Sequence, residues 1–411
     1  MGKVSRRDFL KLAASGGGAA MAVGLGVKDP EHLIPYVVPP EHVRPGVITW
    51  FATTCRECPA GCGMHVAHRD GRAVKVEGNP DHPINRGGLC ARGQSALQGL
   101  YDPDRVRRVV YQPRGGERRS FDWPAAIAEI GRRLRDARGQ VFVISDLQTG
   151  ALAEVTEGFA KALGSQPPAF FEPFNYDTLL AAHHLVFGIG AIPDYRIDRC
   201  DFLISFGVDF LETWISPVQF ANQFAAMRSR RGIAGRRGRF VYVGPRLSMT
   251  AANADEFIQA PPEAVLGVAL AMLKAVVEQQ GERADAKLRA ATGGSAADLV
   301  ARAGVPPERI AELARAFLEA QGSIALAGSD SSSSPLAAVT AVAAALMNHA
   351  AGRIGQTVDF SRTHALGGRN RRAELGELLI RIGPESVVIV LNANPVFTTA
   401  LARETLPLAG T

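Results

Sequence analysis

Apolar residues fall into two patterns along most of the chain. Short continuous apolar runs, bounded by glycine, proline or polar residues, are typical of strands buried on both faces. Longer segments with apolar residues on one side predict helices, and the two kinds of segment alternate. This alternation predicts an α/β fold with parallel sheets. The predicted strands are residues 141–144, 202–207, 240–243, 323–327 and 387–391, and the predicted helices are 124–137, 151–163, 217–229, 264–280, 307–318 and 337–351.

The N-terminal part of the chain follows a different pattern. Apolar and polar residues alternate about Asp70-Gly71, which predicts a β-hairpin with Val66, Val74 and Val76 on its inner face. The predicted fold class is therefore a small β-rich module followed by doubly wound α/β domains. The expected divisions are an export signal at 1–30, an extended arm at 31–46, the β-rich module at 47–105, a discontinuous α/β domain at 106–170 and 321–411, and a second α/β domain at 171–320.

The first residues predict export. Arg6-Arg7 is followed by Phe9-Leu10 and a soft apolar run rich in alanine and glycine, as in a twin-arginine signal. That route requires the twin-arginine translocase as a partner and carries proteins already folded around a cofactor. The expected location is the extracytoplasmic, periplasmic face of the cytoplasmic membrane. No other run is expected to span a bilayer, since 335–347 is too short.

Composition narrows the functions that the chain could have. Its 411 residues allow two or three domains, and the formal net charge of +6 comes from an arginine-rich basic set. Aromatic residues are few and do not alternate with the arginines, which argues against nucleic-acid binding. The arginine runs at 105–108, 132–138 and 228–239 are expected to be solvated, or to bind the phosphates of a large anionic cofactor.

Four of the five cysteines lie in one stretch. Cys55, Cys58 and Cys62 are close together, and Cys90 follows from a separate loop. Three neighbouring thiolates and one distant thiolate suit the four iron corners of a [4Fe-4S] cluster. Structural zinc more often uses two short cysteine pairs, and an exported protein could instead form disulfides, so both alternatives stay open. Cys200 lies in an apolar run and is expected to be a buried thiol outside the site.

The histidines are expected to play secondary parts. His65, His68 and His82 are predicted at surface or turn positions, because four thiolates already complete the metal site. His183 and His184 are predicted to be ordinary helix residues, with a proton relay as the alternative.

Three predicted strand ends carry residues suited to ligand binding. Parallel sheets bind ligands at the carboxyl ends of their strands. Glycine there allows a phosphate or base to approach closely, and Asp, Asn and Arg provide hydrogen bonds. Ordinary turns use the same residue types, but the three ends together predict a nucleotide-bearing cofactor. The residues concerned are Gly207, Asp209, Arg246 and Asn394.

The four-cysteine stretch and the following Ala91-Arg92-Gly93 resemble the molybdenum/tungsten bis-pterin oxidoreductases, the dimethyl sulfoxide reductase superfamily. The resemblance covers nearly all of the chain from residue 47 onward. Within the superfamily, the sequence looks most like catalytic subunits of polysulfide-reductase type and the large subunit of alternative complex III. The segments that carry this likeness are 172–177, 205–214, 245–250 and 394–397.

The resemblance implies a set of cofactors and partners. The cofactors would be a [4Fe-4S] cluster at the four cysteines and a bis-molybdopterin guanine dinucleotide with molybdenum or tungsten. Arg92 would lie between cluster and pterin, where a fixed positive charge stabilises added electron density. Gly207, Asp209, Arg246 and Asn394 would approach the nucleotide ends of the pterin. Electrons would pass to a ferredoxin-like iron–sulfur subunit and then to a quinone-reactive integral membrane subunit.

Two features depart from the catalytic members of the superfamily. Those members usually present a cysteine, selenocysteine, serine or aspartate to the metal, in a loop that corresponds to residues 175–180. Asp177 is the candidate carboxylate ligand there, and an aspartate that caps a helix is an equally good interpretation. Catalytic members also continue past Asn394-Pro395 into a further C-terminal domain, whereas this sequence stops at Thr411.

Three functions are therefore compatible with the sequence. The first is an exported, membrane-associated molybdopterin oxidoreductase that passes electrons between a small substrate or the quinone pool and a partner iron–sulfur subunit. The second is a non-catalytic electron-transfer or scaffold subunit of an assembly like alternative complex III, without molybdenum. The third is an exported protein stapled by zinc.

Overall fold

The computed structural model describes residues 44–113, 116–137, 139–230, 232–233, 235, 237–292, 301, 304–328, 335–369, 372–400, 402 and 406. The predicted export signal at 1–30 and the part of the extended arm before residue 44 lie outside these residues. The described chain divides into two compact units. One consists of residues 44–50 with Ala67–Val74, and the other of Phe51–Val66 with the residues from Lys75 onward.

The smaller unit contains the turn of the predicted hairpin. Strand β2 (Gly63–Arg69) is joined to β3 (Arg72–Gly78) by Asp70 and Gly71. Both residues have positive φ, 49° and 80°, as a two-residue type I′ turn requires. The Asp70 carboxylate accepts a hydrogen bond of 2.8 Å from the backbone N–H of Gly46. The predicted hairpin and its turn are confirmed.

Strand β1 (Thr49–Thr54) completes a three-stranded sheet in the order β1-β2-β3. The predicted inner face is confirmed for Val76, which is 2% exposed, and is wrong for Val74, which is 41% exposed. Val66 is half-buried. A period of two residues assigns a side chain to a face, but burial follows only where another element covers that face.

A four-stranded parallel sheet forms the centre of the larger unit. Its order is β11-β10-β9-β12, and each neighbouring pair is parallel. Its strands are β9 (Phe202–Phe206), β10 (Arg239–Gly244), β11 (Glu256–Gln259) and β12 (Ser323–Leu326).

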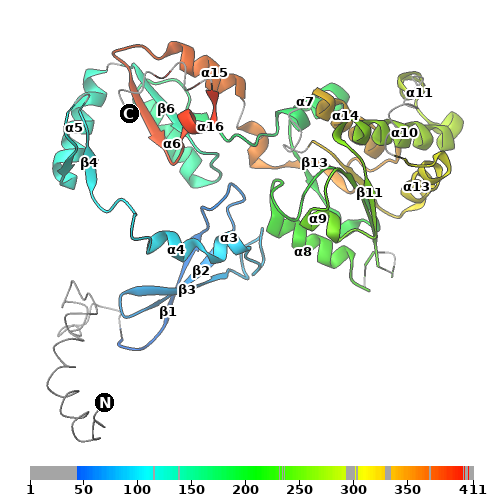
Figure 1. The fold of residues 1–411 in the computed structure, drawn as a ribbon, viewed down its shortest axis with the longest axis horizontal. Coiled ribbons are helices and arrows are strands. Elements are labelled where there is room, and N and C mark those ends of the chain that lie inside the picture. Colours follow the sequence, from blue (N-terminus) through cyan, green and yellow to red (C-terminus); the bar gives the residue numbers. More distant parts are fainter. Residues whose placement is uncertain are drawn as a thin grey trace, which may run out of the picture. The chain divides into compact units, whose positions relative to one another are not determined.

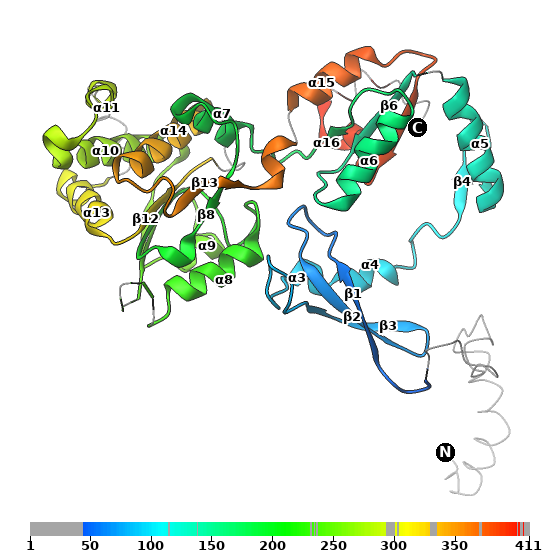
Figure 2. The same ribbon diagram turned by 180° about the vertical axis from the view of Figure 1, so that it is seen from behind.

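Both faces of this sheet are buried, because successive side chains of each strand point to opposite sides. Ile204 belongs to the core that α10 (Pro262–Gln280), α13 (Pro307–Glu319) and α14 (Pro335–Ala350) complete on one face. Leu203 belongs to the core on the other face, which includes side chains of the helix α8 (Pro217–Met227). Figures 1 and 2 show helices on the two sides of these strands. This is the doubly wound arrangement that the sequence predicted.

A second parallel sheet has the order β14-β6-β7. Strand β14 (Val387–Leu391) pairs in register with β6 (Val141–Ser145), so two segments far apart in the sequence form one sheet. The third strand, β7 (Ala169–Phe170), lies on the other edge of β6. Apolar residues of α15 (Arg372–Arg381) share the core of Phe142 and Ile144.

Strand β12 differs from the predicted division at residue 321. Ser323 pairs with Phe202 and Leu326 pairs with Ser205, so β12 extends the sheet of β9 rather than that of β6. An apolar run predicts a buried strand, but the choice between two sheets depends on backbone pairing that the run does not encode. The other predicted domain boundaries remain predictions.

The remaining described elements are mostly short. They are α3 (Ala91–Gln94), α4 (Ala96–Leu100), β4 (Val109–Tyr111), β5 (Arg119–Phe121), α5 (Trp123–Asp136), α6 (Ala151–Ala162), α7 (Asp177–Phe187), β8 (Pro193–Tyr195), η3 (Ile197–Arg199), α8 (Pro217–Met227), α9 (Met249–Ala252), η4 (Gly281–Arg283), α11 (Ala286–Ala291), β13 (Val358–Thr363), η5 (Ala365–Gly368) and α16 (Pro395–Thr398).

One described helical segment, Pro262–Arg283, is long and apolar enough to cross a membrane by length and composition alone. The sequence did not predict this. However, 56% of its apolar window is buried inside the fold, and Val268, Met272 and Val276 are fully buried. A buried core helix passes the same test of length and composition. The apolar residues of α10 pack in the core against the main sheet, as those of a core helix do. The shorter apolar helix α14 is a core helix, as predicted.

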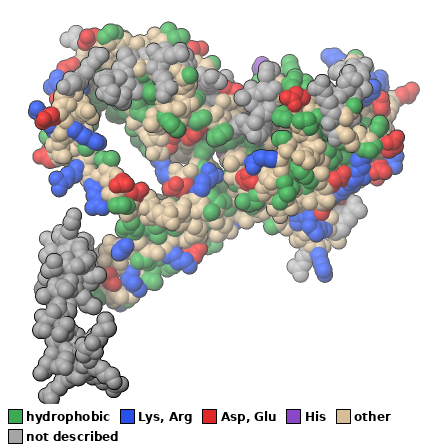
Figure 3. All heavy atoms as spheres, in the orientation of Figure 1, with side chains coloured by type: hydrophobic (Ala, Val, Ile, Leu, Met, Phe, Trp, Pro, Cys, Tyr) green, Lys and Arg blue, Asp and Glu red, His purple; other side chains and the backbone are tan. Residues whose placement is uncertain are grey.

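Two of the three arginine runs, 132–138 and 228–239, are paired with acidic residues. Arg132 donates to Glu129, with 2.9 Å between the guanidinium and a carboxylate oxygen, and Arg239 lies 2.9 Å from Glu256. Arg228, whose side chain is largely buried, forms a bidentate pair with Asp255. Figure 3 shows Lys and Arg side chains interspersed with Asp and Glu over the face that it draws. These two runs therefore act mainly in ion pairs.

Gly322 should tolerate no side chain. Its backbone N–H donates to the carboxylate of Asp201, and its carbonyl oxygen accepts from the N–H of Asp201. A Cβ atom at this position would lie less than 3.0 Å from the carbonyl oxygen of Arg199. Gly322→Ala should therefore force the starts of β9 and β12 apart and lower the free energy of unfolding by about 1–3 kcal/mol in urea titrations. The control is Gly158→Ala on α6, where a Cβ meets nothing within 4 Å, and stability should be unchanged or slightly higher. Equal stability of the two variants would contradict the prediction.

Candidate metal centre

Two loops bring the four cysteines together. Cys55, Cys58 and Cys62 lie between β1 and β2, where the N–H of Cys55 donates to the carbonyl of Cys62 at 2.8 Å. Gly61, with φ 62°, turns the chain back between them. Cys90 arrives from the loop after β3, directly before α3. The side chains of the four cysteines pack into one small cluster, and all of them are free thiols.

Burial makes two of these thiols, Cys55 and Cys62, hard to ionise without a cation. Loss of solvent, followed by repulsion from the neighbouring sulfurs, raises the pKa of Cys62 to about 12. The pKa of Cys55 is raised by the same main cause. A positively charged metal centre reverses this balance, because thiolates are its ligands and their protons are released when it binds. The site therefore fits a metal centre with thiolate ligands.

One alternative to a metal centre is contradicted by the structure. The five cysteines, all of them described, are free, which contradicts disulfide pairing. In the described part of the chain, no group of three or more His, Cys, Asp or Glu residues is placed so that it could hold a metal ion. The preference for an iron–sulfur cluster over zinc therefore rests on the cysteine spacing, three neighbouring thiols and one distant thiol.

Asn85 fastens the two cysteine loops to each other. Its side-chain amide donates to the carbonyls of Gly63 at 2.8 Å and Gly88 at 2.6 Å, and its oxygen accepts from the N–H of Gly63 at 2.9 Å. Gly63 follows Cys62, and Gly88 is two residues before Cys90. Asn85 is fully buried. The sequence signal for it, one asparagine within a turn-rich loop, was too weak to single it out.

Two cavities flank the loop of Cys58. The first has a volume of about 430 Å³, and its lining includes Cys55, Cys58, His82, Asp146 and Gln148. The second has about 330 Å³, and its lining includes Cys58, Arg92, Tyr176, Trp214 and Arg246. Both lie within the size range of small-molecule and cofactor sites. Glu57, Pro59 and Glu172 line both cavities.

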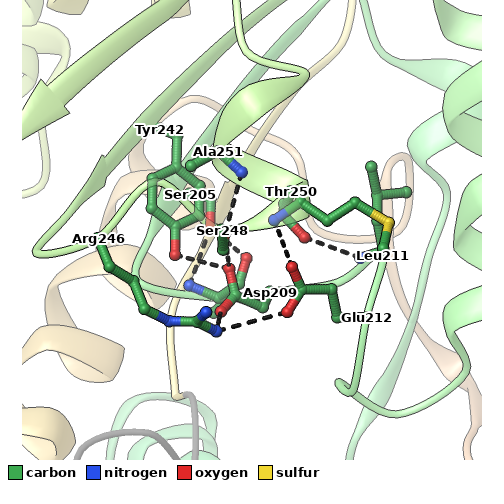
Figure 4. Close-up of polar contacts among 11 residues, drawn as sticks. Ser205, Asp209, Leu211, Glu212, Tyr242, Arg246, Ser248, Thr250 and Ala251 are labelled. Atoms are coloured by element: carbon green, nitrogen blue, oxygen red, sulfur yellow. Dashed lines mark hydrogen bonds and ion pairs between the residues drawn. The ribbon is translucent and has the colours of Figure 1, made fainter.

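Asp209 and Arg246 form a network at the edge of the main sheet (Figure 4). Asp209 is buried and accepts hydrogen bonds from Tyr242 and Arg246, each 2.8 Å, and from Ser248. Arg246 also lies 3.4 Å from a carboxylate oxygen of Glu212, and its side chain is 63% exposed. Because three protein donors already use Asp209, it would act on a ligand through Arg246. The exposed guanidinium is the group free to reach an anion.

Arg92 lies in the same region, and Gly207 follows β9 directly. Gly207 has φ 75°, and open space lies where a Cβ would stand. The guanidinium of Arg92 donates to the carbonyl oxygen of Glu212 at 3.3 Å and lines the second cavity together with Cys58 and Arg246. The structure thus brings Asp209, Arg246 and Arg92 together beside Cys58, whereas Gly207 lines neither cavity. The roles of these residues toward a cofactor remain predictions.

Asn394 and Asp177 are placed differently. Asn394 caps α16 by accepting the N–H of Phe397 at 3.2 Å, and the neighbouring Asn392 lines the first cavity instead. Asp177 begins α7, and its N–H donates to the side chain of Asn175 at 3.1 Å. Neither Asn394 nor Asp177 lines either cavity next to the cysteines. Because Asp177 is the first residue of α7, a role at the helix terminus is favoured over a metal ligand. An acidic side chain there stabilises the first turn of the helix.

Glu172 is a carboxylate that the sequence did not single out. It lines both cavities, and burial, followed by repulsion from Asp146, raises its pKa. It lies in the segment 172–177, whose likeness to the superfamily was clear, but no local pattern distinguishes it from an ordinary loop glutamate.

His183 and Cys200 are structural. His183 is buried on α7, where its Nδ1 donates to the carbonyl of Ala191 at 2.8 Å and its Nε2 accepts from Tyr195 at 3.3 Å. Burial lowers its pKa to about 4, so the ring is neutral at neutral pH and suits packing rather than a proton relay. Cys200 is buried against Met227, with 3.6 Å between the sulfurs, as predicted. His184 is exposed on the same helix.

Comparisons with known proteins agree with this geometry. Residues 48–102 match the molybdopterin oxidoreductase Fe4S4 domain. The chain is 28% identical over 377 residues to the menaquinone reductase molybdopterin-binding-like subunit of Nitratidesulfovibrio vulgaris, covering 87% of this chain and 54% of that protein. It is 27% identical over 295 residues to the arsenate respiratory reductase molybdopterin-containing subunit of Shewanella sp. ANA-3, covering 65% of this chain and 32% of that protein.

A solved structure shares the fold. Acetylene hydratase from Pelobacter acetylenicus superposes with a TM-score of 0.55 at 16% identity, over 74% of this chain and 43% of that chain. At this level of identity the likeness concerns the fold alone.

A four-cysteine module joined to doubly wound α/β sheets is the architecture expected of an iron–sulfur protein. The matching domain and the relatives support a likeness to the molybdopterin oxidoreductases of the dimethyl sulfoxide reductase superfamily, and with it a [4Fe-4S] cluster and a molybdopterin as cofactors. The four cysteines fit the cluster. The second cavity offers two arginines and three aromatic rings to a pterin, and its lining also contains the carboxylates of Glu57, Glu172 and Asp209. The chain spans about half the length of the menaquinone reductase subunit, 54%.

Removing the amide of Asn85 should loosen the metal centre. Asn85→Leu keeps a similar volume but leaves the buried N–H of Gly63 without its acceptor, which should lower the free energy of unfolding by about 2–4 kcal/mol. Because Cys62 and Cys90 are then no longer held together, iron per chain should also fall. Asn253→Leu, at the exposed asparagine that follows α9, is the matched control and should change neither quantity. Full iron content in Asn85→Leu would contradict the proposed role of this clamp.

Stability should decline in mild acid because of His183. The ring titrates near 6.5 when unfolded and at about 4 in the fold, so only the unfolded chain takes up a proton between these values. The stabilisation is therefore complete above pH 6.5 and is lost as the pH falls toward 4. The loss should reach about 3 kcal/mol in urea unfolding measured across this range.

Two variants separate the contribution of His183 to the acid slope of stability from the contributions of other groups. His183→Leu should flatten the acid slope, and the exposed His184→Leu should keep it. His364, whose pKa burial also lowers to about 4, should add a similar slope in both variants. An unchanged slope in His183→Leu would show that the ring is already charged in the fold.

Proposed function

We propose that the chain is the iron–sulfur and molybdopterin-binding part of an exported, membrane-associated oxidoreductase. It would pass electrons between a small substrate or the quinone pool and a partner iron–sulfur subunit. The observation that carries this proposal is the joint placement of Cys58 and Arg92, which line one cavity together with Arg246. A redox centre held by the cysteines and a second cofactor in that cavity would be separated by little more than the Cys58 loop.

The chain's own groups have distinct parts in this proposal. When bound, the cluster supplies one-electron transfer and the molybdopterin centre two-electron chemistry. Arg92 and Arg246 would bind the anionic cofactor and stabilise added negative charge, and Asp209 would orient Arg246. Trp214 and Tyr176 would supply apolar walls that exclude water from the second cavity. Glu172, whose pKa burial raises, lies at the wall common to both cavities.

The location and partners are part of the proposal. Arg6-Arg7 and the apolar run behind it support export through the twin-arginine translocase. The likeness to a menaquinone reductase subunit supports work beside a quinone-reactive membrane protein, with a ferredoxin-like subunit as the electron carrier between them. The location is then the extracytoplasmic face of the membrane.

A second function has its own support. The segment 175–180 would have to present a ligand to molybdenum, yet Asp177 begins a helix and lines neither cavity beside the cysteines. Arg246, moreover, is already shared by two carboxylates. The alternative is an electron-transfer or scaffold subunit that keeps the cluster and has no molybdenum. The name of the menaquinone reductase subunit, molybdopterin-binding-like, agrees with this second function.

Metal analysis of the full chain, purified without oxygen, separates these functions. The primary proposal expects about four iron atoms per chain, with molybdenum or tungsten, and reduction of a small oxo-acceptor by reduced viologen. Iron without molybdenum or tungsten, and without that activity, would replace it by the second function. Zinc in place of iron would reject both.

The cysteine assignment has a matched pair of variants. Cys90→Ser should lose most of the iron and the broad visible absorbance, because one corner of the cluster loses its thiolate. Cys200→Ala removes a buried cysteine outside the site and should retain the full iron content. Iron loss in Cys200→Ala alone would reverse the assignment.

A further inference from the structure

His82 lies in the turn-rich loop after β3, as expected, and its ring is also packed against the cysteine loops. The ring packs directly over Gly63, where an added Cβ would lie 2.5 Å from the ring carbon Cγ. Gly63 follows Cys62, so only a residue without a side chain leaves room for the ring here. His82 also lines the first cavity together with Cys55 and Cys58.

One nitrogen of this ring lacks a partner. Nδ1 of His82 is buried and has no hydrogen-bond partner among the described residues. A buried polar atom without a partner costs about 1–3 kcal/mol, so such atoms normally meet a ligand, an ion or an ordered water. The cavity that His82 lines also has Cys55 and Cys58 in its wall. A group bound by those cysteines is therefore the natural partner for Nδ1.

We propose that His82 donates an N–H hydrogen bond from Nδ1 to a sulfur of the iron–sulfur centre held by Cys55, Cys58, Cys62 and Cys90. This inference rests on the cluster in the proposed function and adds a residue that tunes it. Reduction adds one negative charge to the cluster, and a hydrogen bond to sulfur stabilises that charge. The effect is large in a buried site, where water screens little. His82 thus raises the reduction potential of the cluster, and Gly63 is the position that makes room for it.

The potential of the cluster tests this directly. The full chain is purified without oxygen, and the cluster is titrated with mediators while its reduced form is followed by electron paramagnetic resonance. His82→Leu removes the donor and should lower the reduced-to-oxidised ratio at a fixed potential about tenfold. For a one-electron couple this corresponds to a midpoint about 59 mV lower. His82→Asn places an amide N–H near the position of Nδ1 and should recover most of the change.

A matched histidine serves as the control. His65→Leu lies on β2 of the same module and does not line the first cavity, so its midpoint should equal that of the wild type. Iron and acid-labile sulfide are measured in every variant, which separates a shift in potential from partial loss of the cluster. An unchanged midpoint in His82→Leu with full iron content overturns the inference.

The wild type provides a second, independent measurement should His82→Leu lose the cluster. Chain labelled with ¹⁵N-histidine is reduced and examined by pulsed electron paramagnetic resonance. A weak nitrogen coupling to the reduced cluster is expected, and it should vanish in His82→Asn, whose side-chain nitrogen carries no label. A spectrum without histidine coupling overturns the inference, even where the cluster is fully assembled. A wild type without any cluster would instead overturn the proposed function on which the inference rests.

Discussion

The convergence of four cysteines in one small cluster is the constraint on which the rest of the N-terminal module depends. Loss of solvent and mutual repulsion raise the pKa values of the two buried ones, Cys55 and Cys62, so in the absence of a cation these two thiols resist ionisation. A cationic cluster offsets this cost, because each thiolate then gains a bond to iron. The rest of the N-terminal module serves this convergence. The hairpin supplies one loop, the turn-rich segment after it supplies the other, and Asn85 joins them through three hydrogen bonds.

The α/β body places polar groups beside that centre. Parallel strands end at one edge, and the loops that follow β9 and β10 carry Asp209 and Arg246 to the cavity that Arg92 and Cys58 also line. Asp209 accepts hydrogen bonds from donors of the protein itself, so its role is to position Arg246. The ordering of a charged side chain by a buried carboxylate lowers the entropy lost when an anion binds. The site therefore consists of a rigid cluster module and a preorganised basic edge.

The residues that the sequence overlooked share a physical character. Asn85, Glu172 and His82 act through burial and through contacts with segments distant in the chain. Each looks like an ordinary loop residue, since loops commonly contain Asn, Glu and His. Glu172 becomes a wall of two cavities only because the segment after β7 passes the cysteine loop. His82 comes to face the cysteines only because Gly63 leaves space for its ring.

The sequence by itself determined the alternation of strands and helices, the hairpin with its Asp70-Gly71 turn, and the four cysteines of the metal centre. These follow from local rules: a residue period, a turn that needs positive φ, and a spacing of thiols that few other sites use. Only the tertiary structure decided that β12 joins the sheet of β9, that Asn392 rather than Asn394 reaches a cavity, and that Asp177 begins a helix. Strand partners and cavity walls depend on contacts between segments more than a hundred residues apart. The energy of such a contact depends on both segments, so neither segment predicts it alone.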